Sequence, residues 1–383
     1  MRTLQIANGY FGNKIYYNFF NILKEKNIDN VIFVPQKKNS EITNNKILLE
    51  KKVFAPNCFS GIDRLFFYRK EKKIFQTLIS EYRDEIKTIN IVHAHTLFSN
   101  GYIAYLMNKN FNIPYIVAVR NTDINIFFKY RRNLRNIGIE IMKNASEIVF
   151  LSNVSKKEVF CKYINRKDEE SLLNKTMVIP NGVNDFWIKN RVKSKKNVNK
   201  NEYRLIYVGE INRNKNVRAT ILACKKLIAD NKHVRLTVVG KCANARFRRM
   251  LNEDFIEYNK YCTQEELINY YRNSDLFIMP SIKESFGVVY AEALTQGLPV
   301  IYTKGQGFDG QFQNGEVGFG VNCKDINEIK NMIMKIYDEY DSIQDRILKL
   351  NDSFNWDNIS DEYIEIYGEL LRRQQHSNNR SKQ

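Results

Sequence analysis

The densest group of residues suited to chemistry lies between Pro280 and Pro299. A helix is expected to begin near Gly287, and its first amides, at residues 286–288, would be bare and able to take a phosphate or a sugar hydroxyl. Glu284 lies just before this helix and Glu292 one turn into it. Two carboxylates so placed would hold the diols of a ribose and a hexose, with phosphates between them. The structural alternative is that both are helix-capping or surface acids.

A second group follows an expected strand that ends at Gly209. Its polar loop carries Arg213 and Lys215 where a helix begins, and flexible cations beside a helix amino terminus suit a diphosphate. The alternative is a basic loop that only caps the helix. Gly240 ends another apolar strand, and the three glycines of Tyr302–Gly310 would let the backbone approach a ligand closely.

The amino-terminal half offers polar candidates at two strand ends. His93 and His95 alternate along an expected strand, and we expect one on each side of the sheet. A histidine at a strand end is otherwise a hydrogen-bonding residue of the interior. Arg120 and Asp123 follow a further strand and would either bind a substrate or form an internal salt bridge.

The sequence argues against a metal site. It contains no Asp-x-Asp pair, which manganese-dependent transferases commonly use, and its four histidines form no ligand cluster. The six cysteines include no Cys-x-x-Cys spacing, so they are expected to be reduced and buried. We therefore expect neither a metal nor another cofactor.

Alternating strands and helices are expected to position these loops. In the first half, short β-branched or aromatic runs predict strands at Leu4–Asn8, Asn30–Pro35, Ile89–His95, Tyr115–Arg120, Glu147–Ser152 and Met177–Ile179. Helical patterns between them lie at Lys14–Lys26, Asn100–Asn110 and Ser155–Tyr163. Such alternation predicts a parallel sheet covered on both faces.

The composition changes at Lys189–Glu202, where six basic residues and four asparagines predict a solvated loop or hinge. A second alternating series follows. Its expected strands are Arg204–Val208, Leu236–Gly240, Phe255–Tyr258, Leu276–Pro280 and Val300–Tyr302, and its helices are Asn216–Asp230, Gln264–Asn273, Gly287–Gln296 and Asp325–Tyr340. A final helix is expected at about Ile359–Arg373. The prediction is α/β, with two doubly wound domains in tandem.

The charge predicts an anionic partner. The 383 residues include 60 Lys and Arg against 42 Asp and Glu, a net charge of +18, which suits nucleic acid, an acidic membrane or a phosphorylated substrate. The alternative is a surface merely decorated with lysine. Leu65–Phe75 and Ile126–Ile141 interleave aromatic and basic residues, as helices at a membrane surface do. Because no nucleic-acid-binding motif accompanies them, a membrane is favoured and nucleic acid is not.

Two further absences bear on location. No apolar stretch approaches the ~20 residues that span a bilayer. The first 13 residues lack the apolar core of a secretory leader. We expect a cytoplasmic protein.

The carboxyl half resembles glycosyltransferase family 4, whose members have the GT-B architecture. The resemblance covers roughly residues 204–322 and rests on Glu284 and Glu292 with seven residues between them, on Lys215 after a strand-end glycine, and on the surrounding order Asp275, Pro280-Ser, Glu284-Ser-Phe-Gly, Glu292-Ala and Gly297-Leu-Pro-Val. A looser similarity covers Ile91–His95, Val119–Asp123 and Ile179–Gly182.

The resemblance implies two Rossmann-like domains whose parallel sheets face across a cleft. Residues 1–185 would bind the acceptor, and the helix at about 359–373 would pack back on them. Residues 186–358 would bind a nucleotide sugar. Family members transfer the sugar with retention of anomeric configuration and without a metal.

Residue roles also follow from the resemblance. Lys215 and Arg213 would neutralise the donor diphosphate, Glu292 would hold the ribose, and Glu284 would contact the hexose beside the amides of Phe286, Gly287 and Val288. Gly12, Gly209 and Gly240 would approach the donor. His95 would lie near the anomeric carbon and, with Arg120 and Asp123, bind the acceptor; His95, Glu284 and Lys215 would act in catalysis.

Two departures from the family pattern stand out. Glu210 occupies a position that is often arginine, and we expect Arg213 to supply that charge. In Arg120-Asn-Thr-Asp123, a histidine-glycine pair is more usual before the aspartate.

The expected function is transfer of a hexose from a nucleotide sugar, UDP-linked by expectation, to a saccharide or lipid-linked saccharide. This would serve capsule, lipopolysaccharide or similar surface-glycan synthesis on the inner face of the plasma membrane. One alternative is a GT-B nucleotide-sugar epimerase or phosphorylase. Another is a non-catalytic basic protein that binds membrane or nucleic acid.

Overall fold

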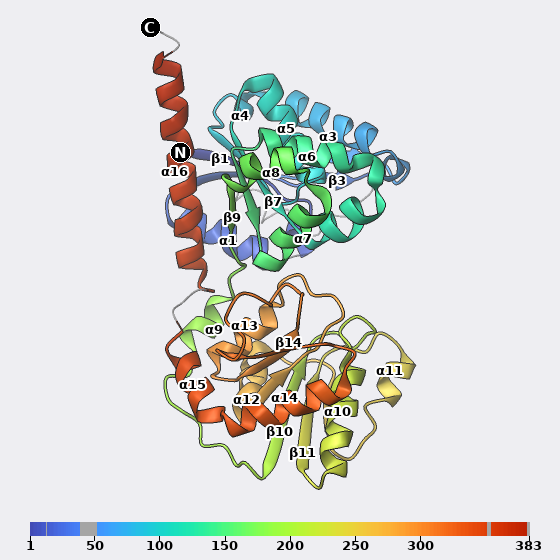
Figure 1. Ribbon diagram of the computed structural model, residues 1–383. Helices are drawn as coiled ribbons and strands as arrows, with labels where there is room; N and C mark the ends of the chain where they lie inside the picture. The colour runs from blue at the N-terminus through green and yellow to red at the C-terminus, as the bar shows by residue number, and fades with distance from the viewer. Residues whose placement is uncertain (13, 39–51, 351–353, 381–383) are drawn as a thin grey trace. The chain divides into compact units, whose positions relative to one another are not determined.

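The protein, seen in a computed structural model, forms two compact units (Figure 1). The structure describes residues 1–12, 14–38, 52–350 and 354–380. Unit 1 comprises Met1–Leu151, Ser155–Pro180 and Trp356–Gln383, and unit 2 comprises Ser152–Val154 and Asn181–Asn355. The sequence predicted domains of 1–185 and 186–358, with the last helix joined to the first.

Unit 1 is built on a sheet whose strands all pair in parallel. In spatial order the strands are β4 (Val53–Phe54), β2 (Asp29–Phe33), β1 (Arg2–Ile6), β6 (Ile91–Ala94), β7 (Tyr115–Val119), β8 (Glu147–Phe150) and β9 (Thr176–Val178). The central strands are buried along their length, as expected where helices cover both faces. A small separate sheet pairs β3 (Gln36–Lys37) with β5 (Asn57–Phe59).

The helices of unit 1 cover two apolar cores, one on each face of the sheet. The helices are α1 (Lys14–Glu25), α3 (Phe67–Glu81), α4 (Arg83–Ile86), α5 (Ser99–Phe111), α6 (Arg135–Asn144), α7 (Asn153–Tyr163), α8 (Arg166–Leu173) and α16 (Trp356–Arg380), with short turns η1 (Tyr10–Gly12), η2 (Ile62–Leu65), η3 (Asp123–Phe128) and η4 (Arg132–Leu134).

Helix α16 packs beside α1 on one of these cores. Its buried residues recur at helical spacing: Trp356, Ile359, Tyr363, Ile366, Tyr367 and Leu370. The helix is longer than the expected 359–373 because Trp356 already belongs to this stripe and polar residues extend the other end.

Unit 2 has a parallel sheet in the order β12 (Ile256–Asn259), β11 (His233–Val239), β10 (Glu202–Val208), β13 (Leu276–Ile278), β14 (Val300–Thr303) and β15 (Gly318–Val321). Its helices are α9 (Asp185–Lys189), α10 (Val217–Ala229), α11 (Ala245–Arg249), α12 (Gln264–Asn273), α13 (Val288–Thr295), α14 (Ile326–Asp338) and α15 (Tyr340–Leu348). The doubly wound α/β prediction is confirmed for both units.

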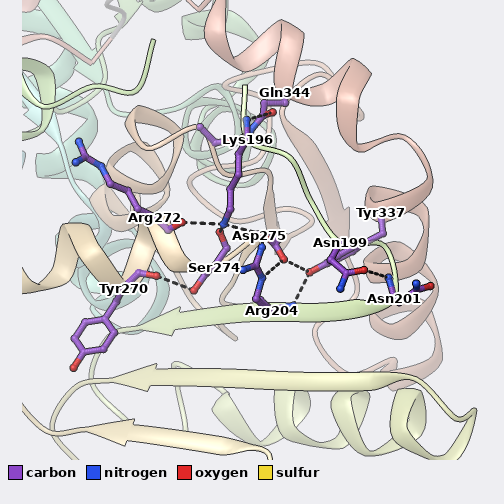
Figure 2. Close-up of polar contacts among 11 residues, drawn as sticks. Lys196, Asn199, Asn201, Arg204, Tyr270, Arg272, Ser274, Asp275, Tyr337 and Gln344 are labelled. Atoms are coloured by element: carbon purple, nitrogen blue, oxygen red, sulfur yellow. Dashed lines mark hydrogen bonds and ion pairs between the residues drawn. The ribbon is translucent and has the colours of Figure 1, made fainter. Parts of the chain in front are cut away.

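Residues 190–201 form a largely exposed loop, as the composition predicted, but the loop is also attached to unit 2. Lys196 reaches the buried carboxylate of Asp275 at 2.9 Å, while its backbone amide donates to Gln344 Oε1 at 3.0 Å. Arg204, just beyond the segment, binds the same carboxylate through two hydrogen bonds of 2.8 Å (Figure 2). The segment is therefore a strap pinned to unit 2, and we call residues 190–201 the strap.

One of the two aromatic–basic segments differs from expectation. Leu65–Phe75 lies mostly in α3, as predicted, but Ile126–Ile141 is not one helix. It is divided among η3, η4 and α6. Among the described helices, none is long and apolar enough to cross a membrane.

Candidate active site

The strand order reverses at one place in each sheet. In unit 2 the reversal lies between β10 and β13, and in unit 1 between β1 and β6. Loops that leave the carboxyl ends of such strands turn to opposite faces of the sheet and open a crevice for ligands. The loops of unit 2 carry Lys215 and Glu284, and those of unit 1 carry Gly12 and His95. These are candidates that the sequence singled out.

Two glycines let the first loops of unit 2 run very close together. Gly209 and Gly240 end β10 and β11 with φ of +155° and +145°. A Cβ atom on Gly240 would lie 2.0 Å from the carbonyl oxygen of Gly209, inside its backbone. Only glycine fits there. The close approach at Gly240 is therefore made to the backbone of Gly209.

Asparagines join the loop after β10 to the loop after β13. Asn216 caps α10 in the left-handed region, with φ of 55°, and its Nδ2 donates to Pro280 O at 3.0 Å and to Cys323 O at 2.8 Å. Asn214 Nδ2 donates to Lys283 O at 2.9 Å, and its Oδ1 accepts from the Lys283 amide at 3.1 Å. The two loops therefore form one rigid surface.

Lys215 and Glu284 meet on this surface. Lys215 Nζ lies 2.5 Å from Glu284 Oε2, with the lysine side chain 25% exposed and the glutamate 7%. The Lys215 amide donates to Asn212 Oδ1, and Glu284 Oε1 accepts from the Ser285 amide. These bonds fix the backbone at Lys215 and Ser285. An incoming anion can therefore replace the contact of Lys215 Nζ with Glu284 without moving either loop. A phosphate and a hydroxylated ring could share this pair.

The amino end of α13 lies beside the pair. Gly287 caps the helix with φ of +76°, and a Cβ there would lie 2.4 Å from the Tyr290 ring and 3.2 Å from Glu284 Cγ. No acceptor among the described residues takes the backbone amides of Phe286, Gly287 or Val288. The lack of a described acceptor agrees with the bare amides that the sequence predicted, and such amides can donate to oxygens of a ligand.

The loop that contains Gln306 and Gly307 packs against this turn. A Cβ on Gly307 would lie 1.8 Å from Ser285 O, and the Gly307 amide donates to Glu284 O at 3.0 Å. Gln306 Oε1 accepts from the Glu284 amide at 3.0 Å. At Gly307 the close approach expected toward a ligand is made to the protein's own backbone.

The remaining candidates for donor binding lie at the same edge of the sheet of unit 2, outside the pair of Lys215 and Glu284. Glu292 is half-buried on α13, and its charge, after burial itself, raises the pKa of Tyr271. Arg213 is exposed on the loop of Lys215. Glu210 is also exposed, so the departure at this position puts an acid near the edge of the site.

The histidines of unit 1 differ from expectation. His93 and His95 lie on the same side, with stacked rings 4.1 Å apart, since residues two apart on a strand share a face. Both are at most 1% exposed, and the rings of Tyr16, Phe19 and Phe20 enclose His95. His95 therefore does not reach a crevice surface in this conformation.

A buried network holds both rings in place. Gln5 Nε2 donates to Tyr367 OH at 3.3 Å, and the same hydroxyl is hydrogen-bonded to His93 Nδ1 at 2.7 Å. His95 Nε2 donates to Gln5 Oε1 at 2.8 Å, so the neutral imidazole of His95 carries its proton on Nε2. Burial lowers the pKa of His93 to about 3 and holds that of His95 well below its usual value.

Arg120 and Asp123 form no ion pair among the described contacts. Asp123 is 1% exposed and accepts from the amides of Leu97, Phe98 and Arg120 at 2.8–3.1 Å, so it closes turns in the interior. Burial raises its pKa to about 6. Arg120 Nε donates to His95 O at 3.3 Å, and its Nη1 is buried without a described partner.

Gly12 ends η1 in the loop after β1. It is exposed, and a Cβ there would meet nothing within 4 Å. The structure thus gathers Lys215, Glu284 and the 286–288 amides, keeps Gly12 at an open edge, and buries His95 and Asp123.

Sequence reasoning missed the residues that hold this geometry. Asn214, Asn216 and Gln306 fix the loops of unit 2, and Gln5 and Tyr367 fix the histidines of unit 1. An asparagine at the start of an expected helix is a usable signal for Asn216. No local signal points to Tyr367, which lies hundreds of residues from its partners.

Comparison with known proteins agrees with the geometry. Residues 188–349 match the family model of glycosyl transferases group 1. The chain is a glycosyltransferase. This glycosyltransferase is 24% identical to an uncharacterized glycosyltransferase of Methanocaldococcus jannaschii, over 75% of the chain and 77% of the relative. It is 26% identical to the capsular polysaccharide biosynthesis glycosyltransferase CapM of Staphylococcus aureus, over 43% of the chain and 46% of CapM.

Solved structures show the fold of this glycosyltransferase to be GT-B, as predicted. Sucrose-phosphate synthase from Thermosynechococcus elongatus superposes with a TM-score of 0.71 at 18% identity, covering 97% of this chain and all of the other. Anabaena HepE in complex with UDP and glucose superposes with a TM-score of 0.61 at 16% identity, with both chains fully covered.

Proposed function

We propose that the protein is a retaining, metal-independent glycosyltransferase of family 4 that moves a hexose from a UDP-sugar to a saccharide or lipid-linked saccharide. The complex of HepE with UDP and glucose supports the donor class. The similarity to CapM supports a role in surface polysaccharide synthesis. The acceptor would be met on the inner face of the plasma membrane.

One observation carries the proposal: Lys215 and Glu284 form a pair beside three unpaired amides where the strand order reverses. Cleavage of a nucleoside diphosphate sugar leaves negative charge on the diphosphate. A fixed ammonium and helix amides stabilise that charge as it develops. Glu284 can accept hydrogen bonds from hexose hydroxyls, and Glu292 from those of the ribose.

The proposed reaction is a substitution on one face of the sugar. The bond between the anomeric carbon and the diphosphate oxygen breaks, and a bond to the acceptor oxygen forms on the same face. The acceptor hydroxyl proton passes to the departing phosphate oxygen, so no protein base is needed. Lys215 and the amides of residues 286–288 hold the leaving group. His95 is enclosed by aromatic rings and does not contact the reacting atoms in this scheme.

Replacing the lysine tests the site directly. Lys215→Met should lower kcat/KM for the best donor at least about 100-fold, as loss of one charge-stabilising donor does. It should also abolish the rise in melting temperature that UDP-sugars cause. The matched control is Lys225→Met, since Lys225 is a surface lysine of the same unit, 2.7 Å from Glu253. Equal activity of the two variants would remove Lys215 from the site.

The alternative reactions have distinct readouts. An epimerase changes the donor when no acceptor is present, whereas this transferase should only hydrolyse it slowly. An NMR time course should show a product that keeps the donor's anomeric configuration, and activity should persist in EDTA. An inverted product, or loss of activity to the chelator, contradicts the proposed mechanism. A non-catalytic binding protein would turn over no donor at all.

A further inference from the structure

Two segments far apart in the sequence meet on one surface of unit 1. The Phe67 ring, at the start of α3, lies 6.1 Å from the Phe127 ring of η3. Phe127 stacks on Phe98 at 4.5 Å, and Phe67 packs on Tyr102 at 5.5 Å. These aromatic rings form a packed cluster that connects α3, and η2 just before it, to η3.

The residues next to this cluster point large apolar side chains into solvent. Aliphatic and aromatic side chains alike are about half exposed or more: Ile62 (67%), Leu65 (70%), Phe66 (55%), Tyr68 (49%), Ile126 (51%) and Tyr130 (66%). We call these six residues and the exposed bases between them, Arg64, Arg69, Lys72, Lys129 and Arg132, the aromatic–basic surface.

The outward charge of this surface is wholly positive. Residues 61–75 and 123–135 contain nine basic residues and three acids, Asp63, Glu71 and Asp123. All three acids are at most 1% exposed. Asp63 lies under Lys73 and Arg69, at 2.8 and 3.3 Å, and Glu71 under Lys70 at 2.6 Å. Asp63 and Glu71 therefore hold basic side chains in place, and none of the three acids offers its negative charge to a partner.

We propose that the aromatic–basic surface is where the protein docks on an anionic lipid bilayer. The six apolar side chains enter the interface between headgroups and acyl chains, and the surrounding bases bind lipid phosphates. This inference deepens the proposed function, on which its biological meaning rests, because it names the face that would meet a lipid-linked acceptor.

Side-chain type favours a bilayer over nucleic acid. Both partners attract positive charge, and both can use aromatic rings. Three of the six exposed side chains are aliphatic, namely Ile62, Leu65 and Ile126, and these have no flat face on which a base can stack. Burial in an acyl region stabilises aliphatic and aromatic groups alike.

Vesicle sedimentation of the full-length protein tests the surface. The protein should sediment with vesicles of phosphatidylglycerol and phosphatidylcholine, should be released as salt rises, and should ignore phosphatidylcholine alone. Leu65→Ser with Ile126→Ser should lower partitioning at least tenfold. Lys72→Gln and Arg132→Gln should each lower it about fivefold, the effect of one basic residue near an anionic surface.

The matched control is Tyr261→Ser. Tyr261 of unit 2 is 68% exposed beside Lys260, which is the same chemistry away from the surface. If Tyr261→Ser weakens binding as much as the paired serine variant, or if that variant binds like the wild type, the proposal is wrong. The proposal is also wrong if single-stranded RNA displaces the wild-type protein from the vesicles and binds the wild type and the paired serine variant equally.

Donor binding separates this inference from the proposed function. The serine variant should keep the wild-type rise in melting temperature with UDP-sugars and the wild-type rate with a water-soluble acceptor. If the wild-type protein sediments with the vesicles but shows neither a rise in melting temperature with UDP-sugars nor turnover of them, the site in unit 2 is refuted and the docking surface stands.

Discussion

The histidine pair of unit 1 is buried and uncharged in a polar network. Tyr367 is hydrogen-bonded to the ring of His93, and Gln5 to the ring of His95. Because burial lowers both pKa values, protonation below the usual range is disfavoured in the fold but not in the unfolded chain. The residues that keep this network closed lie on β1, β6 and α16 of unit 1.

We expect unit 1 to lose stability as the pH falls below about 6.5. The unfolded chain then binds protons that folded His93 does not bind until about pH 3, and the pKa of folded His95 is also well below its usual value, so each histidine removes about 1.4 kcal/mol of stability per pH unit. His93→Gln should flatten this dependence when unfolding free energy is measured by urea denaturation from about pH 7.5 to 5.

Two buried acids change the stability in the opposite direction with pH. Both acids are present in the wild type and in His93→Gln. Burial raises the pKa of Glu71 to about 7 and of Asp123 to about 6, so they lose stability as the pH rises through this window. The difference between wild type and variant cancels their effect. His233→Gln, at an exposed position of β11, is the control. A pH dependence unchanged by His93→Gln would contradict the buried neutral state.

At the scale of elements, backbone contact at strand ends shapes the site of unit 2. Gly240→Ala should lower the unfolding free energy of unit 2 by about 3 kcal/mol, because the new Cβ would overlap Gly209 O and no rotamer can relieve a backbone clash. Donor binding should weaken further, since the loop of Lys215 follows Gly209. Denaturation and donor titration measure the two effects.

Gly305→Ala separates conformational strain from overlap. Gly305 also has a positive φ, +73°, but a Cβ there meets nothing within 4 Å. It should therefore lose only the 1–2 kcal/mol that a left-handed alanine costs. Equal losses in the two variants would mean that the contact with Gly209 is unimportant.

The same elements show what the sequence can reveal. Buried apolar strands such as Tyr115–Val119 and the capped helix after Gly287 follow from local patterns, and the structure has them. Strand β15, Gly318-Phe-Gly-Val321, was not predicted because its glycines lack strand propensity. The structure needs one of them, since a Cβ on Gly318 would lie 1.9 Å from Val300 O.

The candidate site divides in the same way. The loops of Lys215 and Glu284 were predictable, because each follows an apolar strand and starts a helix. Their pairing was not, because it depends on Asn214 and Asn216 reaching across sixty-odd positions to the other loop. His95 was predicted at a strand end, but its burial depends on α1, whose aromatic residues carry no local sign of their target.

At the scale of the whole molecule, the chain passes between its two units at residues 151–152, 154–155, 180–181 and 355–356. The strap follows the passage at 180–181 and is bound to unit 2 rather than free. In addition to the contacts of Lys196, the Val192 amide donates to Thr295 O at 2.9 Å, and Arg191 Nη2 donates to Leu350 O at 2.6 Å. Any motion between the units must therefore bend the chain outside these contacts.

Asp275 is the centre of that attachment, and its replacement should loosen it. The carboxylate is fully buried and takes Arg204, Lys196 and the Tyr337 hydroxyl, at 3.3 Å for the last (Figure 2). Asp275→Asn leaves two cations facing a neutral group, so unit 2 should lose about 3–5 kcal/mol of unfolding free energy. Hydrogen exchange followed by mass spectrometry should show faster exchange in the strap and β13, with unit 1 unchanged.

The adjacent surface pair provides the control for this prediction. Lys195 lies 2.6 Å from Asp345, with both side chains nearly half exposed, so Lys195→Gln should change stability by less than about 1 kcal/mol. If Asp275→Asn behaves like Lys195→Gln, the buried cluster does not hold the strap. If exchange in the strap is already fast in the wild type, the segment is the solvated hinge that its composition predicted, and the long-range contacts of Lys196 are too weak to override local sequence.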